Sequence, residues 1–262
     1  MKRLFPAAFF AGLCAFLSES AHSQIVFSED FTGPGTSLTI DIGPNYSATV
    51  SGGVLKLGNS TPGFEVGRAY TTQSWADNNF VISVDVHPEQ MAFTEGLISV
   101  FAYGNSAYPD NGYSAELVQV GFTVDEYRLQ IRGGSTILVQ SSIFNILSDP
   151  SGSPDYTKFS LSLSGAFLSG SLELTANFTP DPLDNPTSLG PISVSHTVGT
   201  PDLTLNQWGI RQLTGGNFVN VDYDNFEIVV IPEPSTWVLL FGGLIAVGFL
   251  RWQQGKRIAS AN

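Results

Sequence analysis

Apolar and polar residues alternate over several stretches of the chain. Over 80–86, phenylalanine, isoleucine and valine occupy the even positions, while valine, serine and aspartate occupy the odd ones. The stretches 158–164 and 168–178 repeat this alternation, with leucine, alanine and phenylalanine set against serine, threonine and other polar residues. Because successive side chains of a strand point to opposite faces, each stretch predicts a strand with one buried face and one solvent-exposed face. We therefore expect antiparallel sheets.

Turn-forming residues separate the alternating stretches. They fall at Gly52-Gly53, Asp110-Asn111-Gly112, Gly133-Gly134, Ser151-Gly152-Ser153-Pro154 and Gly215-Gly216. Such residues favour short hairpin connections. The sequence predicts an all-β domain, a two-sheet antiparallel β-sandwich, with helices only at the two ends of the chain.

Composition agrees with one medium-sized domain, because 262 residues with 42% hydrophobic content can bury a substantial core. The single cysteine, Cys14, lies near the N-terminus, so the domain would be held by packing rather than by disulfides. Positions 24–231 contain six Lys or Arg against 21 Asp or Glu. Such an acidic surface repels nucleic acid, so we expect no nucleic-acid partner.

The N-terminal residues have the pattern of a secretory signal peptide. Met1-Lys2-Arg3 is basic, Leu4 to Leu17 is apolar, and Ala21-His22-Ser23 places small residues before a cleavage point at Gln24. A short membrane helix is the alternative interpretation. Pro6 and the polar stretch 18–20 limit its apolar length. We therefore predict that residues 1–23 are a signal peptide and that the protein is exported.

The C-terminal residues form a three-part tail. Pro232-Glu233-Pro234 ends the preceding strand, because neither proline can donate to a ladder. Residues 235–252 are predominantly apolar and would extend roughly 27 Å as a helix, at about 1.5 Å per residue. This length approaches the bilayer core of about 30 Å. Basic residues then follow at 251, 256 and 257, and the positive-inside rule would keep them cytoplasmic.

This tail, 232–262, resembles the PEP-CTERM sorting signal. The resemblance implies that exosortase, a membrane transpeptidase-like enzyme, recognises the tail and processes it. The protein would be anchored transiently in the inner membrane by the 235–252 transmembrane helix and then released to the cell surface or extracellular matrix. An ordinary C-terminal membrane anchor is the alternative.

The order of elements between the two ends resembles a concanavalin A-like, laminin-G-type jelly roll over residues 24–231. The resemblance rests on an opening strand at 27–31, the stretches 111–117, 127–134, 156–163, 168–178 and 208–211, and a closing strand at 221–228. It implies that the first and last strands lie side by side. Glu29 and Asp30 would then lie near Asp222 and Asp224, where carboxylates suit a structural Ca²⁺. The alternative is that these acids simply face solvent.

A glycoside hydrolase is a second hypothesis. Asp222-x-Asp224-x-x-Glu227 resembles the Glu-x-Asp-x-x-Glu strand of laminarinase-like enzymes. Apolar residues occupy odd positions before Asn225 and even positions after it, so a bulge near Asn225 would bring all three acids to one face. An aspartate in the first position and the location at the end of the domain depart from that family's pattern.

Tyrosines offer a possible sugar-binding rim. Tyr103, Tyr108 and Tyr113 flank the loop 105–112, and aromatic rings can stack on sugars. The alternative is that these rings belong to the core, as most aromatic residues of a sandwich must. His87 and His196 receive no functional role, because each falls at or within a strand pattern.

These observations predict an exported, non-enzymatic surface or matrix protein, sorted by exosortase, whose β-sandwich binds extracellular polysaccharide. A purely structural, acidic component of the biofilm matrix is the alternative from a different class.

Overall fold

The computed structural model describes residues 24–59, 64–72, 79–90, 96–105, 112–120, 126–146, 158–183, 189–215 and 220–231. The signal peptide and the sorting tail predicted above lie outside these residues. The described residues contain strands and no helix, so none of them forms a helical segment suited to crossing a membrane. Residues Ile25–Val230 form one compact unit, which contains every core side chain named below.

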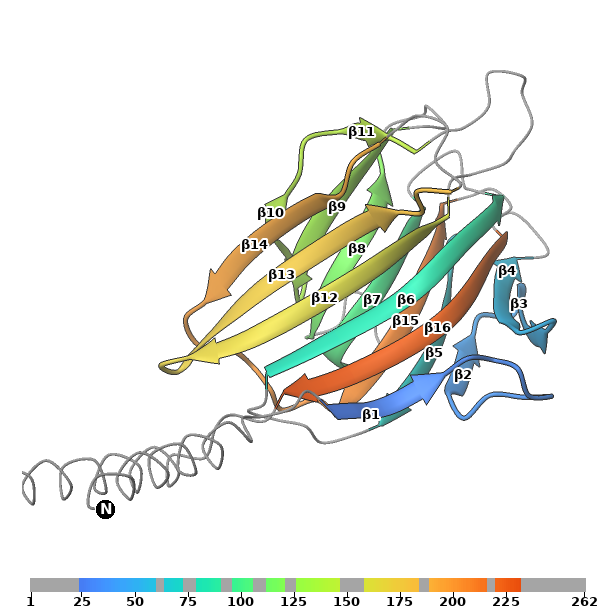
Figure 1. Ribbon diagram of the computed structural model, residues 1–262, viewed down its shortest axis with the longest axis horizontal. Helices are drawn as coiled ribbons and strands as arrows, with labels where there is room; N and C mark the ends of the chain where they lie inside the picture. The colour runs from blue at the N-terminus through green and yellow to red at the C-terminus, as the bar shows by residue number, and fades with distance from the viewer. Residues whose placement is uncertain are drawn as a thin grey trace, which may run out of the picture. The chain divides into compact units, whose positions relative to one another are not determined.

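The described strands form two eight-stranded antiparallel sheets that pack face to face (Figure 1). We call them sheet A and sheet B. Sheet A has the order β14-β13-β12-β6-β16-β4-β3, with β1 also paired to β16. Its strands are β1 (Gln24–Glu29), β3 (Tyr46–Ser51), β4 (Val54–Asn59), β6 (Asn79–Gln90), β12 (Phe159–Leu168), β13 (Ser171–Pro180), β14 (Ile192–Val198) and β16 (Asn220–Ile231).

Sheet B has the order β10-β9-β8-β7-β15-β5-β2, with β11 also paired to β9. Its strands are β2 (Thr39–Ile42), β5 (Phe64–Thr72), β7 (Leu97–Gly104), β8 (Tyr113–Gln119), β9 (Glu126–Gly133), β10 (Thr136–Gln140), β11 (Phe144–Asn145) and β15 (Gln207–Gly215). The prediction of an all-β, two-sheet antiparallel sandwich is confirmed.

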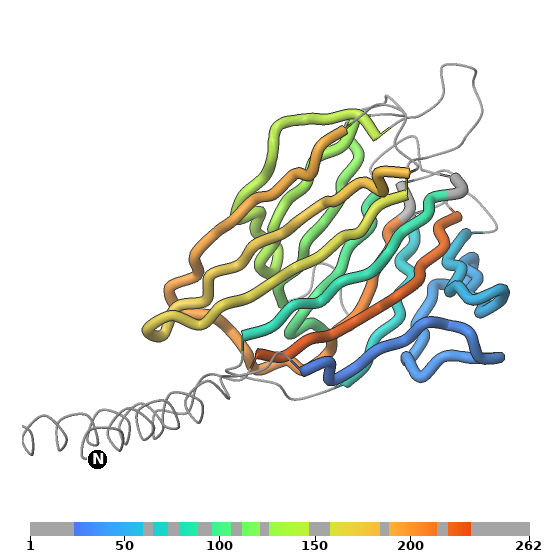
Figure 2. Tube along the Cα trace, viewed as in Figure 1, coloured from blue at the N-terminus to red at the C-terminus, as the bar shows by residue number. Residues whose placement is uncertain are grey.

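The first and last strands lie side by side, as the jelly-roll resemblance implied. β1 pairs with β16, and the two segments run alongside each other in the Cα trace (Figure 2). β16 is therefore an interior strand of sheet A, since β6, β4 and β1 all pair with it.

One predicted strand, 168–178, proves to be two elements. Leu168 ends β12, and β13 begins only at Ser171. Ser169 and Gly170 both have positive φ, at 52° and 85°. A two-residue hairpin turn with the twist of its flanking strands requires this conformation. The sequence analysis missed the turn because serine is not a strong signal for a left-handed position.

The core lies between the sheets and is built from the alternating apolar residues of both. Near one end, Trp208 packs with ring centroids 4.9 Å from Phe80 and 4.6 Å from Tyr103. Phe80 comes from sheet A, and the other two residues come from sheet B. Edge-to-face and tilted pairs of this kind stabilise the core beyond the area that they bury. They fix how the two sheets lie against each other.

The backbone of β15 passes so close to β5 that only glycine fits at position 209. A Cβ there would lie 2.2 Å from the carbonyl oxygen of Ala69 and 2.7 Å from the Cα of Tyr70. We expect Gly209→Ala to lower the free energy of unfolding of the 24–231 fragment by about 1–3 kcal/mol, because backbone atoms cannot move aside without strain. Chemical denaturation measures this change.

The matched control is Gly190→Ala, since a Cβ at this exposed glycine meets nothing within 4 Å. Its effect should stay within about 0.5 kcal/mol. Equal stabilities for the two variants would contradict the close approach of β15 and β5.

Candidate functional site

The outer face of sheet A is organised by a change of phase within β16. Val221 and Tyr223 are buried before Asn225, whereas Phe226 and Ile228 are buried after it. Asn225 itself is exposed and has a φ of 49°. Asparagine tolerates this left-handed conformation better than most residues. One extra residue therefore shifts the alternation, and the bulge predicted near Asn225 is confirmed.

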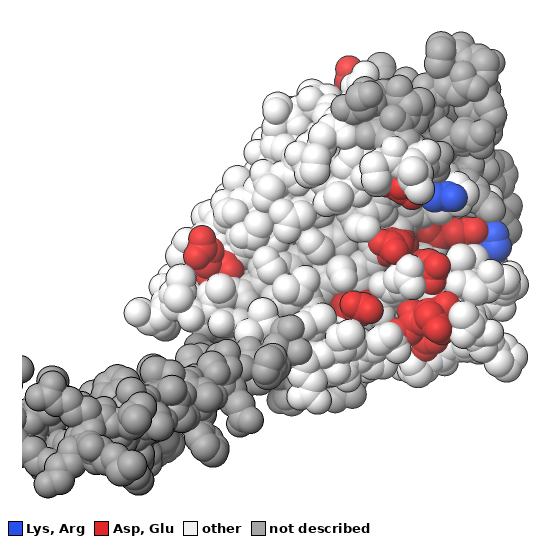
Figure 3. Space-filling view, viewed as in Figure 1, with Lys and Arg blue, Asp and Glu red and all other residues white. Residues whose placement is uncertain are grey.

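The bulge places Asp222, Asp224 and Glu227 on the same face of the sheet. All three are half-buried, and they alternate with core residues on either side of Asn225. Without the shift, Glu227 would point into the core together with Tyr223. In the view onto sheet A, acidic side chains gather near one side of the sheet, with Lys or Arg beside them (Figure 3).

A pocket with a volume of about 430 Å³ opens at this acidic region. Its apolar lining consists of Val54, Val86, Phe159, Pro180 and Pro182. Its polar lining consists of Asp85, His87, Lys158, Ser160, Thr179, Asp181, Asp222 and Asp224. Such a combination of apolar wall and converging polar groups is typical of small-molecule sites.

Hydrogen bonds fix the carboxylates in the pocket. Asp85 accepts one bond from the hydroxyl of Ser160 and another, of 2.9 Å, from Nδ2 of Asn225. Oδ1 of Asp224 accepts the backbone N–H of Asn225 at 2.7 Å. The bulge residue thus holds two carboxylates from neighbouring strands, β6 and β16.

The side chain of Asp222 is largely enclosed. Its side chain is 12% exposed, and its Oδ2 lies 2.8 Å from Nζ of Lys56 on β4. Its Oδ1 is buried without a hydrogen-bond partner among the described residues. A buried oxygen without a partner is costly.

The four residues predicted to bind Ca²⁺ do not form a metal site. Glu29 accepts bonds at 2.8 and 2.6 Å from the N–H and hydroxyl of Ser37, and Asp30 bonds to Thr32 two residues away. Asp222 and Asp224 belong to the pocket instead. Among the described residues no group of three or more acidic, histidine or cysteine side chains is arranged to hold a metal. Adjacent strands did not bring the four carboxylates together, because the first two bind their own loop.

The predicted tyrosine rim is wrong for the two tyrosines that the structure describes. Tyr103 and Tyr113 are 1% and 5% exposed. Tyr103 packs against Phe80 and Trp208, and the hydroxyl of Tyr113 accepts the backbone N–H of Asp202 at 2.9 Å. Tyr108 lies outside the described residues. The alternative interpretation, that these rings belong to the core, holds for Tyr103 and Tyr113.

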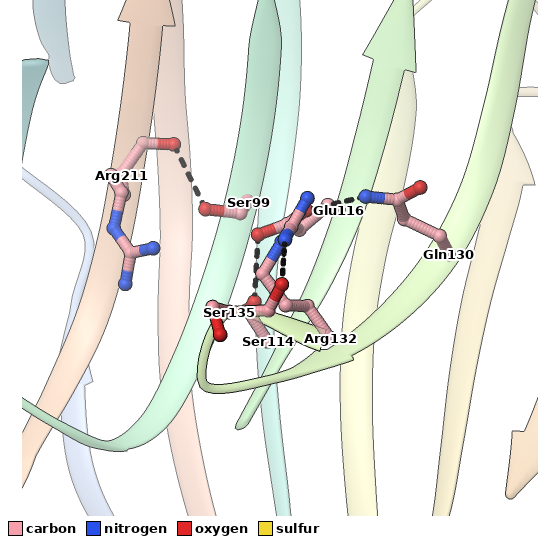
Figure 4. Close-up of polar contacts among 7 residues, drawn as sticks. All are labelled: Ser99, Ser114, Glu116, Gln130, Arg132, Ser135 and Arg211. Carbon is pink, nitrogen blue, oxygen red and sulfur yellow. Dashed lines mark hydrogen bonds and ion pairs between the residues drawn. The ribbon is translucent and has the colours of Figure 1, made fainter. Parts of the chain in front are cut away.

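A second polar cluster lies on sheet B, on the face away from the core (Figure 4). Glu116 is fully buried and accepts bonds from Ser114 at 2.9 Å, Gln130 at 2.7 Å and Arg132 at 3.0 Å. The guanidinium of Arg211 lies 4.7 Å from the ring centroid of Phe101. The bonds from Ser114, Gln130 and Arg132 compensate the buried charge of Glu116, and the last two connect β8 with β9. We therefore assign this cluster to stability.

Sequence analysis missed Asp85, Lys56 and Asn225 as parts of the site. In the sequence, Asp85 is only a polar position within an alternating strand, and Lys56 is only one of the six basic residues of positions 24–231. Both residues lie near Asp222 and Asp224 because β6 and β4 pair with β16. This pairing cannot be predicted from the local sequence of any one strand. The change of apolar phase at Asn225 is visible in the sequence. Its hydrogen bond to Asp85 is not.

Comparisons with known proteins identify the fold. No protein-family model and no curated protein matches the sequence. Among solved structures, the chain is similar to the seed lectin of Lotus tetragonolobus, with 13% identity, a TM-score of 0.55, and coverage of 81% of this chain and 100% of that one.

A lectin from Bauhinia forficata, solved in complex with GalNAc, gives 12% identity and a TM-score of 0.54 over 80% of this chain and 99% of that one. The CBM2 module of the evolved Dit protein of Lactobacillus casei BL23 phage J-1 gives 11% identity and a TM-score of 0.50, over 81% of this chain and 98% of that one. At these identities the likeness shows the fold alone, which is a lectin-like jelly-roll sandwich.

The hydrogen bonds of Glu29 generate a pH prediction. Burial opposes ionisation of Glu29, but the bonds from Ser37 and Thr36 outweigh it and lower the pKa below its ordinary value. A lowered folded pKa contributes stability above the unfolded pKa of about 4.3, and this stability is lost as the pH falls through the folded pKa. We expect Glu29→Gln to melt below the unchanged protein at pH 7, with the difference shrinking below about pH 4.

Melting curves of the 24–231 fragment across this pH range provide the measurement. Ser37→Ala removes one of the donors and should reproduce part of the effect with the same pH dependence. A melting difference between Glu29→Gln and the unchanged protein that stays constant with pH would contradict the assignment.

Proposed function

We propose that the protein is an exported, non-enzymatic surface or matrix protein whose sandwich binds extracellular polysaccharide at the pocket of sheet A. The observation that carries the proposal is the composition of this pocket. Asp222 and Asp224 offer acceptors for sugar hydroxyls, and the half-buried Val54 and the exposed Pro182 offer apolar contacts for the carbon face of a sugar ring.

The lectin-like fold supports this proposal by analogy only, because fold does not determine function. Support from the chain itself comes from Asp222. Its carboxylate lines the pocket and is held in place by the ion pair between its Oδ2 and Nζ of Lys56. Asp224 is half-buried beside it and is held in place by Asn225. The site is thus ordered before any ligand arrives, which reduces the entropy lost on binding.

The two terminal segments of the chain are the proposed signals for export and sorting. The signal peptide 1–23 would direct export. The tail Pro232-Glu233-Pro234, with its apolar segment 235–252 and basic end, would be recognised by exosortase in the inner membrane. Processing would then release the sandwich to the cell surface or the extracellular polysaccharide.

A laminarinase-like glycoside hydrolase is a second candidate, favoured by the shared face of Asp222, Asp224 and Glu227. A retaining mechanism needs two carboxyl groups about 5–5.5 Å apart. Of these three acids, Asp222 and Asp224 line the pocket and Glu227 does not, and Asp222 is paired with Lys56. Release of reducing ends from the bound polysaccharide, abolished by Asp222→Asn and by Asp224→Asn, would favour the hydrolase over the binding protein.

The binding proposal predicts a specific loss of affinity. We expect Asp224→Asn to weaken saccharide binding by the 24–231 fragment about 10- to 100-fold, because a hydrogen bond to a charged group contributes about 1.5–3 kcal/mol. A glycan array identifies the saccharide, and titration calorimetry measures its affinity. Asp224 is preferred over Asp222 for the first variant because it makes no ion pair within the described residues.

Glu173→Gln is the matched control, since Glu173 is an exposed carboxylate of the same sheet outside the pocket. It removes the same charge and should leave the affinity unchanged. Equal losses for both variants would indicate a general charge effect, and no glycan binding by the unchanged fragment would support the purely structural matrix role.

The sorting proposal predicts a change of mass. In the native host the mature protein should lack the residues beyond the Pro-Glu-Pro motif and fractionate with the surface or matrix. In a strain without the sorting enzyme, it should keep the full tail and remain in the inner membrane. Intact-mass measurement of both forms provides the test, and a full-length tail in both strains would mean an ordinary membrane anchor.

A further inference from the structure

The pocket of sheet A carries more negative than positive charge. The aspartate and lysine side chains that line it are those of Asp85, Asp181, Asp222, Asp224 and Lys158. Figure 3 shows the same imbalance on this face, where acidic side chains outnumber basic ones. The cavity and its apolar contacts mark the site independently of its charge. The charge therefore bears on which ligand the site prefers.

One of these aspartates is compensated by a cation outside the lining. Oδ2 of Asp222 lies 2.8 Å from Nζ of Lys56. The other three aspartates of the pocket make no ion pair within the described part of the chain. Three carboxylates therefore stand against one ammonium group, that of Lys158. The half-buried His87 is the remaining titratable side chain of the lining.

The hydrogen bonds that these three aspartates accept within the described residues come from neutral donors. Asp85 and Asp224 accept from hydroxyl, amide and backbone N–H groups. Oδ1 of Asp181 accepts the backbone N–H of Leu183 at 2.8 Å. Neutral donors orient a carboxylate but leave its charge in place. A cationic ligand group would gain from such carboxylates, because hydrogen bonds between ionised partners are about twice as strong as neutral ones.

The charge of the whole domain acts in the same direction as the charge of the pocket. Positions 24–231 contain six Lys or Arg against 21 Asp or Glu. A field of this sign attracts cationic ligands and repels anionic ones. Uronate or sulfate groups of a polysaccharide would also meet like charges at the pocket itself, which opposes binding. The site therefore disfavours acidic saccharides.

We propose that the pocket selects saccharides that carry a free ammonium group, such as amino sugars without an N-acetyl group. This inference rests on the saccharide binding proposed for the same pocket. The ammonium group would bind among the carboxylates of Asp85, Asp181 and Asp224. Val54 and Pro182 would contact the apolar face of the sugar ring.

An ammonium group could also come from a lysine side chain of a basic polypeptide. The pocket favours the sugar for two physical reasons. Its apolar contacts suit the flat face of a rigid ring. A lysine side chain has several rotatable bonds and loses much rotamer freedom on binding, whereas a sugar ring holds its amine in a fixed position.

Titration calorimetry of the full chain in mild detergent, at about pH 6, tests this selection. The probes are a glucosamine oligomer and its fully N-acetylated form of equal length, which keeps the rings but lacks the charge. The glucosamine oligomer should bind at least about tenfold more tightly at low salt. This preference should shrink at about 1 M salt, where the screening length falls to about 3 Å.

The outcomes separate this inference from the proposed function. Equal or tighter binding of the acetylated oligomer overturns the selection for ammonium groups and leaves saccharide binding intact. Binding of only neutral or acidic saccharides on a glycan array has the same meaning. No binding of any saccharide overturns the proposed function, and the inference fails with it.

Two charge variants of opposite sign test the role of the lining. Asp181→Asn removes a charge but keeps an oxygen that can accept the N–H of Leu183. It should reduce the preference for the glucosamine oligomer about two- to fivefold. Lys158→Gln should increase this preference, and Glu173→Gln, outside the pocket, should leave it unchanged. Melting temperatures establish that the variants fold. Shifts of the same sign for Asp181→Asn and Lys158→Gln overturn the inference.

A lysine oligomer of the same charge, titrated under the same conditions, distinguishes the sugar from a basic polypeptide. It should bind more weakly than the glucosamine oligomer, because it has no ring to contact Val54 and Pro182. Tighter binding of the lysine oligomer overturns the assignment to an amino sugar.

Discussion

The arrangement of the whole sandwich depends on one constraint, which is that β16 must bury apolar residues on both sides of a bulge. β16 pairs with β6, β4 and β1, so an error of one residue in its phase would misplace the core contacts of three neighbours. Asn225 absorbs the extra residue by adopting a φ of 49°. Its exposed side chain then bonds to Asp85 across the sheet. The residue that preserves the core therefore also arranges the outer surface.

The two sheets use polar residues in different ways. On sheet B, Glu116 is fully buried, and its neighbours Ser114, Gln130 and Arg132 supply its hydrogen bonds. Such a satisfied network makes the sheet rigid and leaves little for a ligand to gain. On sheet A, Asp222 and Asp224 border an open pocket instead. The physical difference between the two clusters is access, because Glu116 is enclosed by its partners whereas the two aspartates of β16 line a pocket.

The sequence by itself determined the all-β class, the antiparallel strands and the bulge near Asn225, because each follows from which residues alternate along one strand. It also suggested that the first and last strands are neighbours, through resemblance to a known fold. Only the tertiary structure decided that Tyr103 and Tyr113 are buried, that Glu29 and Asp30 bind their own loop, and that Asp85 and Lys56 join Asp222. Local alternation gives the face on which a side chain lies. For Asp85 and Asp222, the partner depends on pairing between strands more than 100 residues apart, and that information is carried by the packed core as a whole.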